Sequence, residues 1–233
     1  MVISLKKIII YGLTFLALFL IYRHFDTKKI NYVSIGDGIT RGINSYGIES
    51  YGYNDFIYDY LKKKNKLGTF NSYFYNGTIN GLIKDIKDNR TIRVDYEEYY
   101  IKKILRESDV LVISVGEDEL SANYQKYDME TNYIYFDKMY VDIENLIKEI
   151  KLYAKGKIIF LGYYNPTNYY DSKVDEFFYD IDIRLNELMM SNDIIYLDLY
   201  EVIKSNRYKD SDKHELNIRG FKKIANLIEY YLE

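Results

Sequence analysis

The side chains that could do acid–base chemistry gather in three short stretches of this 233-residue chain. Asp37 lies in a Gly-Asp-Gly turn, and Asp118 and Glu119 follow a short apolar run. His214 lies among further carboxylates near the end of the sequence. Carboxylates together with an imidazole can bind a divalent metal ion. No closely spaced ligand pair such as His-x-x-x-His is present, so we do not expect a metal site.

Composition excludes several other chemistries. The chain has no cysteine, which rules out disulfides, thiolate metal sites, a cysteine nucleophile and a lipidated cysteine anchor. Imidazole chemistry must rest on His24 or His214, the two histidines of the sequence. The formal net charge of −3 creates no strong field to attract nucleic acid. We expect no nucleic-acid partner and no cofactor.

The first of the three stretches follows a short apolar segment, Tyr32 to Ile35, that is typical of a buried strand. The strand leads into the turn Gly36-Asp37-Gly38 and then into a polar segment. In open α/β sheets, active sites are built on loops that leave the carboxyl ends of strands. The turn is therefore the first place to expect a functional site.

This turn resembles the first motif of the SGNH/GDSL hydrolases, an apolar strand followed by Gly-Asp-Ser-Leu/Ile-Thr. Gly36-Asp37 and Ile39-Thr40 match that motif. The nucleophilic serine of the family falls on Gly38. The resemblance therefore implies the family fold, while the substitution argues against the family's chemistry.

Two further stretches resemble the motifs that bind the oxyanion in this family. Residues 76–81 resemble the second motif, in which the backbone N–H of a glycine binds the oxyanion, and Gly81 fits that role. The third motif is Gly-x-Asn-Asp; here Asp118 stands in place of the asparagine and Glu119 in place of the aspartate. An ionised carboxylate accepts hydrogen bonds but donates none, so Asp118 would repel a developing oxyanion. The resemblance thus implies that Gly38, Gly81 and Asp118 mark the degenerate nucleophile and oxyanion positions.

The last family motif, Asp-x-x-His-Pro-Asn, resembles the stretch that ends at His214 and Asn217. The position three residues before the histidine is Ser211 rather than an aspartate. Asp210 and Asp212 flank that position, so a carboxylate can still reach the imidazole. The resemblance implies His214 as a remnant base and Asp212 as its orienting carboxylate.

The motifs leave two functional hypotheses. In the first, the domain has lost hydrolase activity and serves as a binding or scaffold module. In the second, it is an active esterase or deacetylase that acts on a cell-envelope glycan or lipid. The second needs a non-standard nucleophile, for which Ser34 and Thr40 are weak candidates, or a metal-bound water. We favour the first, because both a nucleophile and an oxyanion donor are missing.

Strands and helices alternate along the rest of the chain, which favours a parallel sheet covered on both faces. We expect one domain over residues 30–233, a three-layer α/β/α structure with a five-stranded parallel sheet. The resemblance implies the flavodoxin-like SGNH hydrolase fold. Residues 96–106 read as a helix and residues 121–136 as a long loop or irregular helix. The expected strands span residues 32–35, 69–75, 110–115, 157–163 and 194–199.

Near the start of the chain, Lys6 and Lys7 are followed by the apolar run Ile8 to Tyr22, and no small-residue cleavage site follows it. This pattern favours an uncleaved signal anchor over a removed signal peptide, with a buried core helix as the alternative. We expect residues 1–29 to form a single-pass membrane helix and linker. Flanking charges leave the orientation open, and the resemblance implies an extracytoplasmic domain. The expected partners are the membrane and a cell-envelope glycan or protein ligand.

Overall fold

The computed structural model describes residues 10–19, 28–44, 47–94, 97–125, 128–165, 172–210 and 216–233. Its centre is a five-stranded sheet in which every neighbouring pair of strands is parallel. The strand order is β2-β1-β5-β6-β7, which is the flavodoxin-like order 2-1-3-4-5 when these five strands are counted along the chain. The expected five-stranded parallel sheet is thereby confirmed. The strands are β1 (Ile30–Gly36), β2 (Leu67–Phe74), β5 (Val110–Ser114), β6 (Lys157–Leu161) and β7 (Ile195–Leu197).

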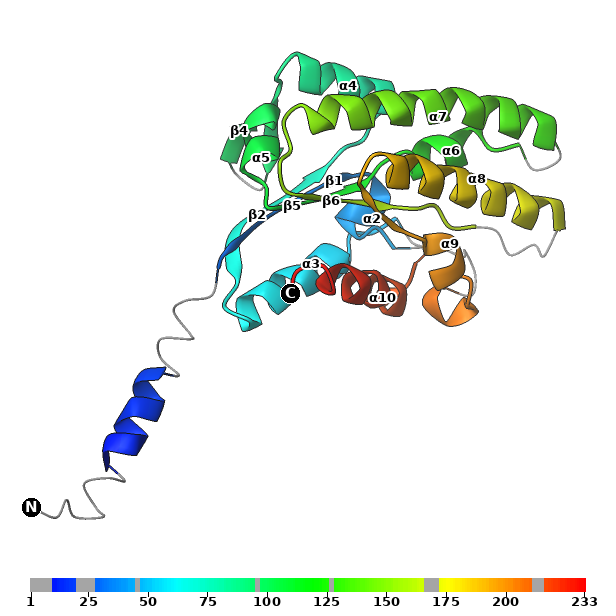
Figure 1. Ribbon diagram of the computed structural model, residues 1–233. Helices are drawn as coiled ribbons and strands as arrows, with labels where there is room; N and C mark the ends of the chain where they lie inside the picture. Colours follow the sequence, from blue (N-terminus) through cyan, green and yellow to red (C-terminus); the bar gives the residue numbers. More distant parts are fainter. Residues whose placement is uncertain are drawn as a thin grey trace, which may run out of the picture.

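Helices cover both faces of this sheet (Figure 1). The central strands are apolar at successive positions because their side chains alternate between two buried faces. In β1, Val33 and Ile35 pack into one core, and Tyr32 packs into the other. The first core contains α4 (Ile79–Lys87), α5 (Ile101–Glu107), α7 (Met129–Lys151) and α8 (Ser172–Ser191); the second contains α3 (Tyr53–Lys63) and α10 (Ile218–Glu229).

Short elements at the strand ends complete the domain. Helix α2 (Gly38–Arg41) follows β1, and α6 (Glu117–Asn123) follows β5. Helix α9 (Leu199–Val202) and the 3-10 helix η1 (Asn206–Tyr208) lie between β7 and α10. Helices α2 and α6 therefore begin where the carboxyl ends of two adjacent strands meet.

The helix expected over residues 96–106 is wrong in its first half. The chain instead forms an antiparallel hairpin of β3 (Thr91–Val94) and β4 (Glu97–Tyr100), followed by α5. Tyrosine favours strands, and Tyr99 pairs with Ile92 across the hairpin. The cross-strand pairing outweighs a helical periodicity that the short segment expresses only weakly.

The segment over residues 121–136 is also more regular than expected. Helix α6 continues to Asn123, and α7 begins at Met129. The side chain of Asp128 accepts a hydrogen bond from the backbone N–H of Thr131 and so caps the start of α7. The buried side chains of Asn132 and Phe136 then place this polar, tyrosine-rich turn against the domain.

Within the apolar run near the start of the sequence, residues 10–19 are helical and their side chains are exposed. Across the described ranges, no helix combines the length and the apolar character that crossing a membrane requires. Residues 8, 9 and 20–22 of the run lie outside the described residues.

The close packing at the end of β1 gives a first prediction. A Cβ on Gly36 would overlap Ser114 Oγ, Thr40 Oγ1 and the Ser114 carbonyl. A Cβ on Gly38 would meet nothing closer than 3.4 Å. We expect Gly36→Ala to lower the free energy of unfolding by about 1–3 kcal/mol, because overpacking forces neighbouring groups apart.

Urea unfolding of the full chain, followed by far-ultraviolet circular dichroism, measures this effect. Gly38→Ala is the matched control, and we expect it to change the free energy of unfolding by less than about 1 kcal/mol. Equal losses in the two variants would contradict the packing described at Gly36.

Candidate functional site

The candidate site is built on the loops that leave the carboxyl ends of β1 and β5. The backbone N–H of Asp37 donates to the Ser114 carbonyl at 2.9 Å, which joins the two loops directly. The backbone N–H of Tyr75, just after β2, donates to the Gly36 carbonyl at 2.7 Å. Three adjacent strands are thus locked together where they end.

Asp37 is the buried centre of this arrangement, with 4% of its surface exposed. Its Oδ2 accepts hydrogen bonds from the backbone N–H groups of Glu117 at 3.0 Å and Asp118 at 3.2 Å. Its Oδ1 is buried and has no hydrogen-bond partner among the described residues. One carboxylate oxygen therefore fastens the start of α6 to the end of β1, while the described part of the chain offers no partner to the other.

Burial has a direct effect on the acidity of Asp37. It raises the pKa of this carboxyl to about 7, and the negative charge of Asp118 adds to the increase. The hydrogen bonds that Asp37 accepts from the backbone N–H groups of Glu117 and Asp118 act in the opposite direction, since they favour the ionised form. The cost of burying the charge is the larger effect.

Gly38 and Asp118 face each other across this junction. The Gly38 N–H donates to Asp118 Oδ2 at 3.1 Å. A Cβ on Gly38 would lie 3.4 Å from Asp118 Oδ1 and 3.5 Å from Asp118 Oδ2. The structure therefore brings together two of the sequence-predicted site residues. A side chain at position 38 would project toward a carboxylate.

Gly81 is the third residue of α4, and its N–H is already engaged. The side chain of Thr78 caps this helix by accepting the Gly81 N–H at 3.1 Å. A Cβ on Gly81 would overlap the hydroxyl of Tyr75, which explains the glycine by packing. The oxyanion-binding role expected for Gly81 thus competes with a helix cap that the sequence did not reveal.

Glu119 lies beside Asp118 and connects α6 to two other helices. Its Oε2 accepts the backbone N–H of Ile79 at 2.9 Å, and its Oε1 accepts the Tyr135 hydroxyl at 3.1 Å. Both contacts come from residues that the sequence analysis did not single out. Glu119 therefore fixes α6 against the starts of α4 and α7.

The hydroxyl groups nearest the turn are committed to a buried network. The Ser34 side chain is fully buried and donates to Ser72 Oγ at 3.1 Å. Thr40 is buried, and its hydroxyl is hydrogen-bonded to the hydroxyls of Tyr53 and Ser114. Neither group points to solvent at the site. No direct signal in the sequence indicated the partners Ser72, Tyr53 and Ser114, because they lie on other elements that only the fold brings close.

His214, Asp212 and Ser211 lie outside the described residues. The motif around them is anchored on both sides. Leu216 forms an antiparallel bridge with Lys209, and the Asn217 side chain accepts the N–H groups of Arg219 at 2.9 Å and Gly220 at 3.1 Å. Asn217 is therefore the N-cap of α10. In the part of the chain that the structure describes, no group of three or more potential metal ligands is found.

The raised pKa of Asp37 predicts a pH dependence of stability. Its ordinary value is about 3.9, so between that pH and about 7 the folded state binds more protons than the unfolded state. The free energy of unfolding therefore falls as pH rises through this range. For this one group we expect a loss of about 2–3 kcal/mol between about pH 5 and pH 8.

The measurement compares urea unfolding of the wild type and Asp37→Asn at several pH values. The variant lacks this titration, so its stability relative to the wild type should improve as pH rises. Asp118→Asn keeps the titration but removes a nearby negative charge that raises the pKa of Asp37, so its loss of stability should end at lower pH and be smaller than in the wild type. Parallel stability curves for wild type and Asp37→Asn would show that Asp37 does not titrate in this range.

No family model and no curated protein matches the sequence. Several solved structures are similar to the chain in fold, among them a lipase and an acetylxylan esterase. The lipase Lip_vut3 from a goat rumen metagenome has a TM-score of 0.70 and 16% sequence identity over 85% of this chain and 95% of the lipase. The acetylxylan esterase Axe2 from Geobacillus stearothermophilus has a TM-score of 0.64 and 16% identity over 88% of this chain and 94% of the esterase. The chain therefore has the three-layer fold of the SGNH/GDSL-type esterases and lipases.

Proposed function

We propose that this protein is a membrane-anchored, extracytoplasmic member of the SGNH-like fold without hydrolase activity, which serves as a binding or scaffold module at the cell envelope. The observation that carries this proposal is the pairing of Gly38 with the Asp118 carboxylate. In the resembled motifs these positions hold the nucleophilic serine and an oxyanion-binding asparagine. Here they hold a residue without a side chain and a hydrogen-bond acceptor.

Ester hydrolysis by this design needs a hydroxyl nucleophile within reach of a base. Gly38 supplies none, and the hydroxyls of Ser34 and Thr40 are buried in hydrogen bonds to other hydroxyls. Without its nucleophile, a triad enzyme retains only about 10³–10⁴-fold acceleration over water, from its oxyanion hole and binding contacts. That residual activity depends on oxyanion donors, and these donors are altered in this chain.

The oxyanion donors are the second argument. Asp118 accepts the Gly38 N–H, and Thr78 accepts the Gly81 N–H, so both backbone donors are directed at protein oxygens. A unit negative charge a few ångströms from a developing oxyanion opposes it by about 1–4 kcal/mol at surface-like dielectric. Loss of one donor alone costs about 10²–10³ in rate. The site is better suited to accept hydrogen bonds from a ligand than to stabilise negative charge.

The chemistry of the site also bears on its ligand. Carboxylates at the carboxyl ends of β1 and β5 can accept hydrogen bonds from hydroxyl or amine groups, which envelope glycans and proteins both carry. The apolar run from Ile8 to Tyr22 supports attachment to the membrane. The family resemblance supports an extracytoplasmic domain. The ligand class we propose is therefore a cell-envelope glycan or protein.

A second candidate function is an active esterase or deacetylase that acts on an envelope glycan or lipid. Two observations favour it: the fold is shared with a lipase and an acetylxylan esterase, and His214 stands in a motif like that of a catalytic base. Structures described as catalytic mutants of Axe2 replace a serine, an aspartate or a histidine of that esterase. Any activity of this kind should respond to EDTA or to a serine-directed phosphonate.

Ester turnover tests the proposal. We expect the full chain, in an uncharged detergent, to hydrolyse p-nitrophenyl acetate no faster than buffer with denatured protein. Ester turnover by the wild type that is abolished in His214→Ala would contradict the proposal and favour the second candidate function, an active esterase.

Reversion of the two altered positions sharpens this test. Gly38→Ser alone installs a hydroxyl beside a carboxylate, so we expect little gain. Gly38→Ser with Asp118→Asn restores nucleophile and donor together, and we expect at least about a tenfold gain over either single variant, because both groups act on one transition state. Gly38→Ala with Asp118→Asn is the matched control without the hydroxyl. Thermal melts confirm folding, and a folded double variant as inactive as this control would show that the remaining groups are not placed for catalysis.

The proposed anchor gives an independent prediction. The full chain, expressed in a bacterial host, should remain in the membrane pellet after an alkaline carbonate wash, because a spanning helix resists extraction while a peripheral protein does not. Protease added to intact spheroplasts should degrade the domain. Release of the full-length chain by carbonate would contradict membrane spanning, and full protection from protease would contradict the extracytoplasmic orientation.

A further inference from the structure

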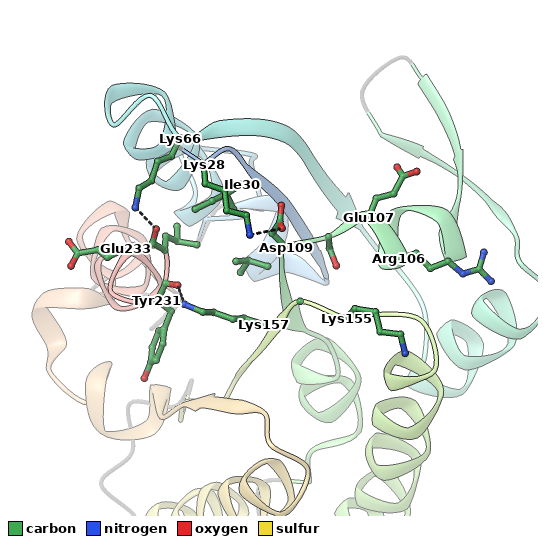
Figure 2. A pocket seen from close by; sticks show the side chains of 14 residues that line it. Lys28, Ile30, Lys66, Arg106, Glu107, Asp109, Lys155, Lys157, Tyr231 and Glu233 are labelled. Atoms are coloured by element: carbon green, nitrogen blue, oxygen red, sulfur yellow. Dashed lines mark hydrogen bonds and ion pairs between the residues drawn. The ribbon is translucent and has the colours of Figure 1, made fainter. Parts of the chain in front are cut away.

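A pocket of about 750 Å³ opens at the amino ends of β1, β5 and β6, the end of the sheet opposite the candidate site (Figure 2). Its volume lies in the range of small-molecule sites. Ile30 and Val110 contribute apolar surface to it. Five basic residues line it: Lys28, Lys66, Arg106, Lys155 and Lys157.

Two of these lysines are held in place by the end of the chain. Lys66 Nζ donates to the Leu232 carbonyl at 3.0 Å, and Lys157 Nζ donates to the Tyr231 carbonyl at 2.7 Å, as the dashed lines of Figure 2 show. An ammonium group has three hydrogens. Each of these lysines therefore keeps donors for a ligand while its position is fixed by a backbone carbonyl.

The other cations are only partly neutralised. Lys28 Nζ lies 3.7 Å from Asp109 Oδ1, a carboxylate whose other oxygen accepts the Asn31 N–H. Among the described residues, Arg106 has a ring contact with Tyr153 but no ion pair, and Lys155 has neither an ion pair nor a hydrogen bond. The pocket is lined by three acidic side chains against the five basic ones.

The pocket has an excess of positive charge, whereas the domain as a whole has an excess of acidic residues. Residues 28–233 contain 29 lysines and arginines against 34 aspartates and glutamates. A basic pocket on an acidic domain favours an anionic ligand at that one place. Ammonium and guanidinium groups are the usual protein partners of phosphate oxygens.

We propose that this pocket is a binding site for a phosphate group. The site is independent of any activity at the carboxyl ends of the strands. Two sources of the phosphate are consistent with its chemistry, an anionic phospholipid headgroup and a soluble phosphate ester. Lys28 lies six residues beyond Tyr22, so an extended chain keeps it within about 20 Å of the end of the apolar run. If that run spans the membrane as proposed, the pocket lies near the headgroups.

Lysine labelling measures occupancy of the pocket residue by residue. The full chain is acetylated with an amine-reactive ester, and labelling rates are read by mass spectrometry. In uncharged detergent, the probes are inorganic phosphate and sodium chloride at equal ionic strength. In nanodiscs, the comparison is phosphatidylcholine alone against phosphatidylcholine with phosphatidylglycerol.

With a phosphate probe bound, we expect labelling of Lys155 and Lys157 to slow by at least about threefold, because their ammonium groups contact the anion. Lys62 and Lys63 are exposed lysines outside the pocket and should keep their rates. Slowing with inorganic phosphate alone assigns the site to soluble phosphates, and slowing with phosphatidylglycerol alone assigns it to lipid. Equal rates under all conditions, or equal slowing at the control lysines, would overturn the proposal.

A variant pair provides the second measurement. Lys155→Gln with Lys157→Gln removes two charges from the pocket, and Lys62→Gln with Lys63→Gln removes two from the exposed surface. The rise in melting temperature with phosphate should vanish in the first pair and persist in the second. If the variant with both pocket lysines replaced does not fold, lysine labelling of the wild type still tests whether the pocket binds phosphate. Retention of the full rise in a folded pocket variant would also overturn the proposal. Ester turnover tests the proposed function separately, so the two can fail independently.

Discussion

The carboxylate of Asp37 is the contact on which the candidate site depends. It is buried at the end of β1 and accepts two backbone N–H groups from the start of α6. Those bonds place Asp118 opposite Gly38, because Asp118 is itself one of the two donors. The buried side chain of Asp37 therefore sets the geometry of the site. This geometry does not require a nucleophile at position 38, so the fold can be kept with glycine there.

This arrangement concentrates negative charge where the resembled hydrolases stabilise an anion. Burial and the charge of Asp118 both raise the pKa of Asp37, so the ionised form of Asp37 is disfavoured here. The Gly38 N–H offsets part of this cost by donating to Asp118. A Cβ at position 38 would make only ordinary van der Waals contact with the two oxygens of this carboxylate, so the glycine and the carboxylate are joined by the hydrogen bond and not by a lack of space. The two substitutions fit together physically.

The sequence predicted the layers of the fold better than the details of the site. Strands such as Val110–Ser114 were recognisable because a continuous apolar run too short for a helix is typical of a central parallel strand. The hairpin of β3 and β4 was missed because its stability comes from pairing between strands, which local periodicity does not record. Gly81 was assigned by motif position alone, and the competing cap by Thr78 depends on a side-chain hydrogen bond that only the folded geometry defines. The order of the motifs predicted that Asp37, Gly38 and Asp118 would lie at the same end of the sheet, but not that the buried Asp37 carboxylate would bind the backbone at the start of α6.

The two ends of the sheet differ in charge, because acidic residues follow the strands at one end and basic residues lie near the strand starts at the other. Strands end toward α2 and α6 with Asp37, Asp118 and Glu119, and they begin near Lys28, Lys66 and Lys157. A cation at the amino end is stabilised by the last carbonyls of the chain after α10, as the bonds to Tyr231 and Leu232 show. The same lysines retain hydrogens that no carbonyl uses. Lys66 and Lys157 therefore stabilise the fold through their bonds to backbone carbonyls. Their remaining N–H groups can donate to a phosphate bound at the same end of the sheet.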